Sequence, residues 1–325
     1  MNLRAFAPLD AKTYVPHELH RTERAWVESN CYIDVWIELV HALGLDPYAF
    51  LPHVLPVDFE GDQWTFFKPS HDDVFALYGL DVHELNVWRP LIENVREHVA
   101  GGKVVLTEVD AFFLPDTAGT DYRRQHTKTT IGIQDIGDGT LGYFHNSSYH
   151  ALDGDDFTSL FRLEMPPDPA YMPFFAEFVR LDRRKLLEGP VLVRESLRVL
   201  RKHLAKRPVR NPVARFRERF PDDLVWLQRE GLATYHGWAF ATLRQLGAAF
   251  ELAARYVRWL SDRGETGLAE AEAAFERISS STKTLVLKTA RAVNGKKPID
   301  AVAALGDAES AWDTGMRVLV ERYGD

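Results

Sequence analysis

The stretch SNCYIDVWIELVHALGLDP, residues 29–47, predicts the helix around which the first half of this chain is organised. Ser29 and Asn30 are residue types that favour an N-cap. Gly44 and Pro47 are typical of the end of a helix. Apolar residues recur between them at helical spacing: Tyr32, Val35, Trp36, Leu39, Val40 and Leu43. The sequence therefore predicts an amphipathic helix over residues 31–43.

Strands are predicted after this helix. The segments KVVLTEVDAFFL (103–114) and HTKTTIGIQ (126–134) are rich in β-branched or aromatic residues. DIGDG then reads as a turn, and TLGYFH (140–145) as the strand that pairs back in a hairpin. The second half of the chain has helical spacing and composition in six segments: 190–206, 223–230, 233–262, 266–279, 282–293 and 298–322.

This order of elements predicts an α+β fold with a C-terminal all-α region. The proline-rich stretch LEMPPDPAYMP at 163–173 disfavours helix and central strand. It divides the prediction into a domain at 1–165 and a helical domain at 166–325. Charge changes in the same place, because residues 1–165 hold 12 basic and 26 acidic residues (net −14) and residues 166–325 hold 27 and 21 (net +6).

The composition excludes several kinds of site and several classes of protein. A single cysteine among 325 residues excludes an internal disulfide framework and a multi-cysteine metal site. The histidines at 126, 145 and 150 lack a known ligand spacing, so no metal is predicted. No uninterrupted apolar run approaches the length of a membrane span, and the first residues do not resemble a signal peptide. We expect a cytoplasmic protein that has no membrane partner.

The one cysteine, Cys31, stands at the start of the predicted helix. Unpaired N–H groups and the positive end of the helix dipole favour a thiolate there. The same N–H groups suit an oxyanion. Cys31 is therefore the candidate nucleophile, against the alternative of a buried structural cysteine.

A nucleophilic cysteine needs a base. His126 opens a predicted strand, at an edge of the sheet where a side chain can face a cleft. The third member, which would orient the imidazole, stays open between Asn146, His145 and Asp110. Asn146 is our first choice, because the hairpin returns it to the same end of the sheet as His126.

The sequence around these residues resembles two families of proteins. The segments NCYIDVWIELVHALGLDP (30–47), EVDAFFLPDT (108–117), HTKTTIGI (126–133) and GYFHNSSYHALDGDDF (142–157) resemble the papain-like acyltransferases of butirosin biosynthesis (BtrH-like proteins). Over most of its length, and especially at DFEGDQWTFFK (58–68), the chain resembles an uncharacterised bacterial family found beside amino acid:carrier-protein ligases.

The first resemblance implies a papain-like fold and acyl transfer from a carrier-protein thioester to a small-molecule amine, through an acyl-cysteine. It implies no bound cofactor, since the acyl group arrives on the carrier's phosphopantetheine. Papain-like peptidases usually have a glutamine shortly before the cysteine, and HRTERAWVESN (20–30) has none. Gln63, beside Trp64, is the candidate for the missing oxyanion donor or a substrate contact, with Asp110 as another candidate for such a contact.

A basic segment indicates a partner. Residues 180–219 hold 14 basic and 4 acidic side chains (net +10) in a chain of net charge −8. Such a patch would steer an acidic carrier protein to the surface. Arg198, Arg201 and Lys202 are predicted to dock it, and the absence of a base-reading motif argues against nucleic acid. The alternative functions are a cysteine hydrolase (thioesterase, amidase or peptidase) and a non-catalytic carrier-binding protein.

Overall fold

The computed structural model describes residues 2–20, 24–166, 168 and 170–324. These residues form two compact units. The first contains residues 2–20, 30–46 and 74–186, and the second contains 24–29, 47–73 and 187–324. The boundary predicted between residues 165 and 166 falls ahead of β9 (Ala176–Arg180), a strand that belongs to the first unit.

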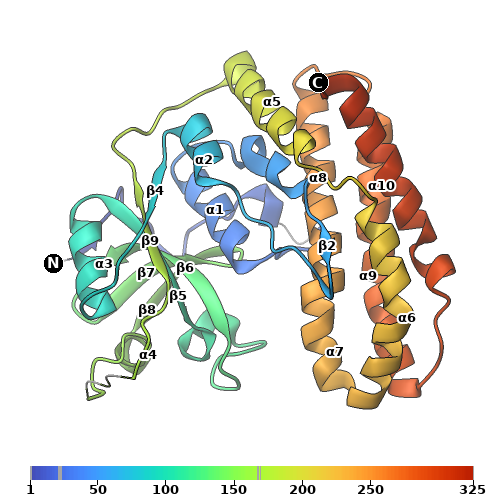
Figure 1. Cartoon of the computed structure of the whole chain (residues 1–325). Coiled ribbons are helices and arrows are strands. Elements are labelled where there is room, and N and C mark those ends of the chain that lie inside the picture. The colour runs from blue at the N-terminus through green and yellow to red at the C-terminus, as the bar shows by residue number, and fades with distance from the viewer. Residues whose placement is uncertain (1, 21–23, 167, 169, 325) are drawn as a thin grey trace. The chain divides into compact units, whose positions relative to one another are not determined.

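The first unit is built on an antiparallel sheet of seven strands (Figure 1). Its order is β4-β9-β5-β6-β7-β8, and β1 adds a short pairing to β6. The sheet confirms the α+β prediction. Its remaining strands are β1 (Leu3–Arg4), β4 (Asp81–Glu84), β5 (Lys103–Asp110), β6 (Lys128–Ile136), β7 (Thr140–His145) and β8 (Ser148–Asp153).

Helix α1 (Cys31–Ala42) packs on one face of this sheet, against β6 and β7. The Asn30 side chain caps it by accepting a hydrogen bond from the Ile33 N–H at 3.0 Å. Gly132 of β6 permits the close approach, because a Cβ there would lie 2.8 Å from a Val35 methyl carbon. The cap and this contact fix the first turn of α1 above the start of β6.

The opposite face carries the main apolar core of the unit. Successive side chains of a strand point to opposite faces, so Ile131 and Ile133 lie on the side away from Gly132. They pack with Val95 and Val99 of α3 (Leu91–Ala100). Short helices complete the unit: α2 (His71–Tyr78), which begins in the second unit, and α4 (Gly154–Leu160).

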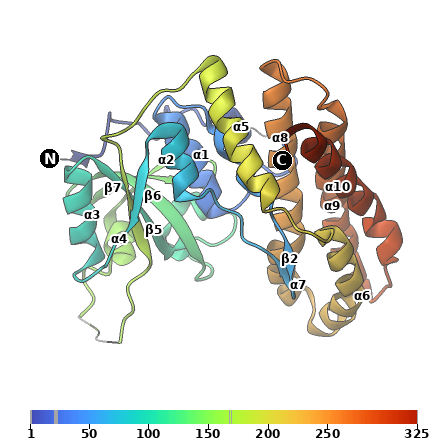
Figure 2. The same ribbon diagram turned by 45° about the horizontal axis from the view of Figure 1, so that its top comes forward.

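The second unit is helical apart from a small ribbon of β2 (Phe59–Glu60) and β3 (Gln63–Trp64). Helix α8 packs on α9, α9 on α10, and α10 on α6 (Figures 1 and 2). The predicted C-terminal helical region is confirmed. Its helices are α5 (Gly189–Ala205), α6 (Pro212–Glu230), α7 (Leu232–Ala239), a π-helical turn (Phe240–Arg244), α8 (Gln245–Asp262), α9 (Ala269–Gly295) and α10 (Ala301–Tyr323).

Several predicted boundaries differ. The strand expected over 103–114 ends at Asp110, whose side chain accepts from the Phe112 N–H and starts a 3₁₀ turn. The two helices expected at 266–279 and 282–293 are one helix, α9. In the described part of the chain, no helix is long and apolar enough to cross a membrane.

Candidate active site at the start of helix α1

Cys31 is the first residue of α1 and is partly exposed. Its thiol lies 3.7 Å from the Thr130 hydroxyl of β6, within hydrogen-bonding distance for sulfur. Tyr32, the next residue, donates from its buried hydroxyl to Glu177 of β9. These contacts hold the first turn of α1 against the sheet.

The sheet surface beside Cys31 is charged. Glu108 of β5 stands directly opposite Thr130, and Asp110 opposite Lys128. Residues paired in this way share a face, as do residues two apart on one strand. Lys128 donates to Glu108 at 2.5 Å. The α1 face of β5 and β6 therefore presents two carboxylates and an ammonium group next to the thiol.

His126 lies just before β6, at the end of the sheet where Asp110 and Lys128 pair. Its ring Nδ1 is 2.5 Å from the Asp110 carboxylate, and the ring stacks on Phe112 with centroids 4.4 Å apart. The side chain is 69% exposed. Asp110 is thus the residue that orients this imidazole, and it was one of the three alternatives left open by the sequence.

Within the described residues, no hydrogen bond joins Cys31 to His126. Thr130 and Lys128 are two residues apart on β6, which separates their Cα atoms by about 7 Å. His126 comes another two residues earlier in the chain, farther from Cys31. The structure therefore places a cysteine and a histidine–aspartate pair toward the same end of the inner strands β5 and β6, with the Lys128 position between them.

Asn146 occupies the turn between β7 and β8, where its φ of 47° places it in the left-handed region that asparagine tolerates. Its neighbour His145 lies on the other face of the sheet. There the His145 Nε2 is 2.8 Å from the Thr129 hydroxyl, and its Nδ1 is 2.5 Å from Asp116. His145 is therefore on the face opposite to Cys31.

Asp116 anchors that second network. Burial alone would raise the pKa of Asp116, but hydrogen bonds from His145 and Tyr143 lower it to about 2. The Tyr143 hydroxyl donates to the same carboxylate at 2.5 Å. These buried partners tie the loop that contains Asp116 to β6 and β7.

The other predicted site residues belong to the second unit. Trp64 is buried against Phe59 and Phe216, and Gln63 is exposed on the β2–β3 ribbon. Their roles near the oxyanion stay predictions. Of the predicted docking residues, Lys202 donates to Asp73 at 2.8 Å and Arg198 to Glu195 at 3.1 Å.

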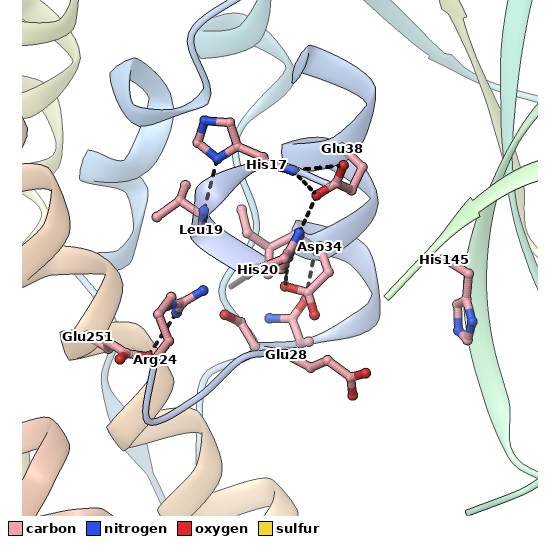
Figure 3. A network of polar contacts seen from close by, with 12 residues as sticks. His17, Leu19, His20, Arg24, Glu28, Asp34, Glu38, His145 and Glu251 are labelled. Carbon is pink, nitrogen blue, oxygen red and sulfur yellow. Dashed lines mark hydrogen bonds and ion pairs between the residues drawn. The ribbon is translucent and has the colours of Figure 1, made fainter. Parts of the chain in front are cut away.

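A buried network on α1 was not predicted from sequence. Asp34 and Glu38, both fully buried, point toward His20 (Figure 3). Glu38 also accepts hydrogen bonds from the Tyr14 hydroxyl at 2.5 Å and from the His17 backbone N–H at 3.1 Å. Two acidic residues four apart inside an apolar helix are the sequence signal that would have found it.

This network predicts how stability depends on pH. Burial lowers the pKa of His20, but hydrogen bonds to Asp34 and Glu38 outweigh it and raise the value to about 9. Burial lowers the pKa of His17 to about 4, and neighbouring His41 adds to the effect. The ordinary pKa of both histidines is 6.5.

We expect the contribution of His20 to be complete below pH 6.5 and lost as pH rises through about 9. The contribution of His17 should be complete above pH 6.5 and lost as pH falls through about 4. Urea unfolding across pH would measure both losses. His20→Gln should flatten the alkaline loss and leave the acid loss in place, whereas an unchanged alkaline loss would contradict the assignment.

The fold and site define a two-part protein with a seven-stranded antiparallel sheet, a helical C-terminal unit, a cysteine at a helix start, and a histidine–aspartate pair toward the same end of strands β5 and β6. The DUF1839 N-terminal domain matches residues 15–181, and the DUF1839 C-terminal domain matches residues 190–321. The chain belongs to the DUF1839 family. No curated protein matches the sequence.

Proposed function

We propose that the first unit is a papain-like cysteine enzyme that transfers an acyl or aminoacyl group from a carrier-protein thioester to an amine. The observation that supports the proposal is the arrangement at one end of strands β5 and β6, where Cys31 begins α1 and His126 is paired with Asp110. A thiolate at a helix start and a base held by a carboxylate are the two parts that nucleophilic catalysis needs.

The chemistry balances with these groups. The Cys31 thiolate attacks the thioester carbonyl, the bond to the carrier's sulfur breaks, and protonated His126 gives its proton to the leaving thiolate. The acyl group is then bonded to the Cys31 sulfur. An amine attacks this thioester, His126 takes the proton from the amine, and the Cys31 thiolate leaves. Asp110 holds the imidazole through Nδ1, so Nε2 is the nitrogen that exchanges protons.

The proposal requires the imidazole to reach the sulfur when substrate is bound. His126 is exposed and lies ahead of β6, so this reach requires a backbone change at 125–126, before the Thr127 carbonyl that accepts from the Ala111 N–H. Lys128 and Glu108, on the surface between the two groups, are available to contact the polar part of the substrate. Asp110 takes the role that the sequence analysis gave first to Asn146.

The test is intact-mass spectrometry after incubation with an aminoacylated carrier protein. The wild-type chain should gain the mass of the aminoacyl group, and Cys31→Ala should not. A mass gain that survives in Cys31→Ala would place the acyl group elsewhere and overturn the proposal.

The same assay separates the alternatives. A transferase gives a product that depends on the added amine, whereas a hydrolase releases the free acid at the same rate with or without it. A non-catalytic carrier-binding protein gives neither product nor mass gain. Only an amine-dependent product, together with the loss in Cys31→Ala, supports acyl transfer.

A further inference from the structure

A pocket of about 370 Å³ lies along helix α5 in the second unit. Its wall combines apolar side chains with three arginines, two from α5 and one from the segment that follows α8. The residues that line it are Gly189, Pro190, Val193, Arg194, Leu197, Arg201, Arg263 and Glu265.

The two arginines of α5 are available for a ligand. Arg194 and Arg201 are seven residues apart, so they lie on the same side of the helix, two turns from each other. Both are exposed, and neither forms an ion pair with a carboxylate of the described residues. Two guanidinium groups that line one pocket and form no ion pair there favour a bound anion.

The third arginine and the one carboxylate of the pocket are held in place. The Arg263 guanidinium stacks over the Trp259 ring at 4.3 Å. Glu265 accepts from the Tyr323 hydroxyl at 2.7 Å and from Arg322 at 3.4 Å. The negative charge of Glu265 is therefore compensated from outside the pocket, which leaves the pocket positive.

Six other cations of the basic segment 180–219 are in ion pairs within the second unit. These ion pairs, formed by side chains of α5, α6 and the segment between them, are Arg198–Glu195, Lys202–Asp73, Arg210–Glu218, Arg215–Asp58, Arg217–Glu309 and Arg219–Asp223. The net charge of 180–219 thus overstates the free positive surface. Arg194 and Arg201 are an exception, and they line the same pocket.

We propose that this pocket binds the phosphate group of a phosphorylated small molecule. Guanidinium groups match phosphate oxygens through paired N–H donors. The volume exceeds what an inorganic phosphate ion fills, and the side chains of Val193 and Leu197 offer an apolar wall to an attached organic chain. The phosphate contacts the arginines, and the chain lies along α5.

Isothermal titration calorimetry on the full-length protein tests this with matched ligands. 4′-Phosphopantetheine and adenosine monophosphate are compared with pantetheine and adenosine, which lack the phosphate, and with inorganic phosphate. We expect at least one phosphorylated ligand to bind at least tenfold more tightly than its unphosphorylated match and than inorganic phosphate. Equal binding within both matched pairs, or no binding of either phosphorylated ligand, would overturn the proposal.

Variants locate the site. Arg194→Gln and Arg201→Gln should each weaken binding about tenfold or more. Arg198→Gln is the matched control, because Arg198 is on the same helix but pairs with Glu195 outside the pocket lining, and it should leave binding unchanged. Equal affinity in all three variants would place the ligand elsewhere. The proposal would also be overturned if no phosphorylated small molecule binds and the two pocket variants instead lose binding to an acidic carrier protein. The two arginines would then contact a protein.

The inference does not rest on the proposed acyl transfer. Cys31 belongs to the first unit and the pocket to the second. Cys31→Ala should therefore keep the full affinity for the phosphorylated ligand, whatever it does to acyl transfer. A loss of ligand binding in Cys31→Ala would contradict a separate phosphate site.

Discussion

Replacing Glu38 by alanine should destabilise the first unit by about 3–5 kcal/mol, the usual cost of removing one partner from a buried charged network. Glu38 is fully buried and accepts hydrogen bonds from three groups: the His20 ring, the Tyr14 hydroxyl and the His17 backbone N–H. The substitution leaves all three donors without this acceptor, and of these the His20 ring is fully buried. Urea unfolding at pH 7 would measure the loss.

Two controls make this result specific. Glu97→Ala on α3 removes a carboxylate of the same unit whose side chain is 73% exposed, and it should change stability by no more than about 0.5 kcal/mol. The chain has two compact units, so a urea transition alone does not say which unit unfolds. Hydrogen exchange of the α1 amides reports on the first unit and shows whether this unit has lost stability. A loss below about 1 kcal/mol for Glu38→Ala would show that water replaces the carboxylate.

Local patterns made α1 predictable. The cap at Asn30, the apolar stripe and Gly44 all act within a few residues, and α1 begins at the predicted residue. Strands β5, β6 and β7 follow similarly from composition and a turn. Strand β9 was not predicted, because its five residues pair with β4 and β5, more than 60 residues earlier in the chain. Such a pairing leaves no local pattern.

Two helices show how local signals mislead. Pro221 followed by two aspartates resembles a helix start, but α6 begins at Pro212 and continues through Pro221. The run of serine and threonine near residue 280 resembles a break. In α9 these hydroxyls instead donate to carbonyls of the preceding turn, as Thr282 does to Ile278 at 2.6 Å. The helix continues because its own carbonyls satisfy the polar side chains.

The candidate site was partly predictable because two of its features are local in the sequence. A cysteine at a helix start is a local feature, and so is a histidine that opens a strand. The partner of that histidine depends on strand register, which pairs Asp110 with Lys128 and so places Asp110 beside His126. The buried carboxylates of α1 depend on His20, which lies more than ten residues earlier in the chain. Neither arrangement can be derived from spacing alone.

His126→Ala should lower the rate of acyl transfer by about 10²- to 10⁴-fold, the usual contribution of a general acid and base. Asp110→Asn should lower it less, because the imidazole remains but loses the carboxylate that orients it. His126→Ala should also remove one limb of the pH–rate profile, which Asp110→Asn should keep because its imidazole is still present. Initial rates with the aminoacylated carrier and a saturating amine would measure these effects.

The first unit supplies a matched control in a second histidine–aspartate pair. On β4, His83 lies 3.0 Å from Asp81 and stacks on Phe178, much as His126 pairs with Asp110 and stacks on Phe112. His83 is also exposed, but it is at the edge strand β4, and β9 and β5 separate β4 from β6. His83→Ala should therefore leave the rate unchanged. Equal rates in His126→Ala and His83→Ala would mean that the pair at His126 stabilises the loop before β6, and that Cys31 takes its base from another group.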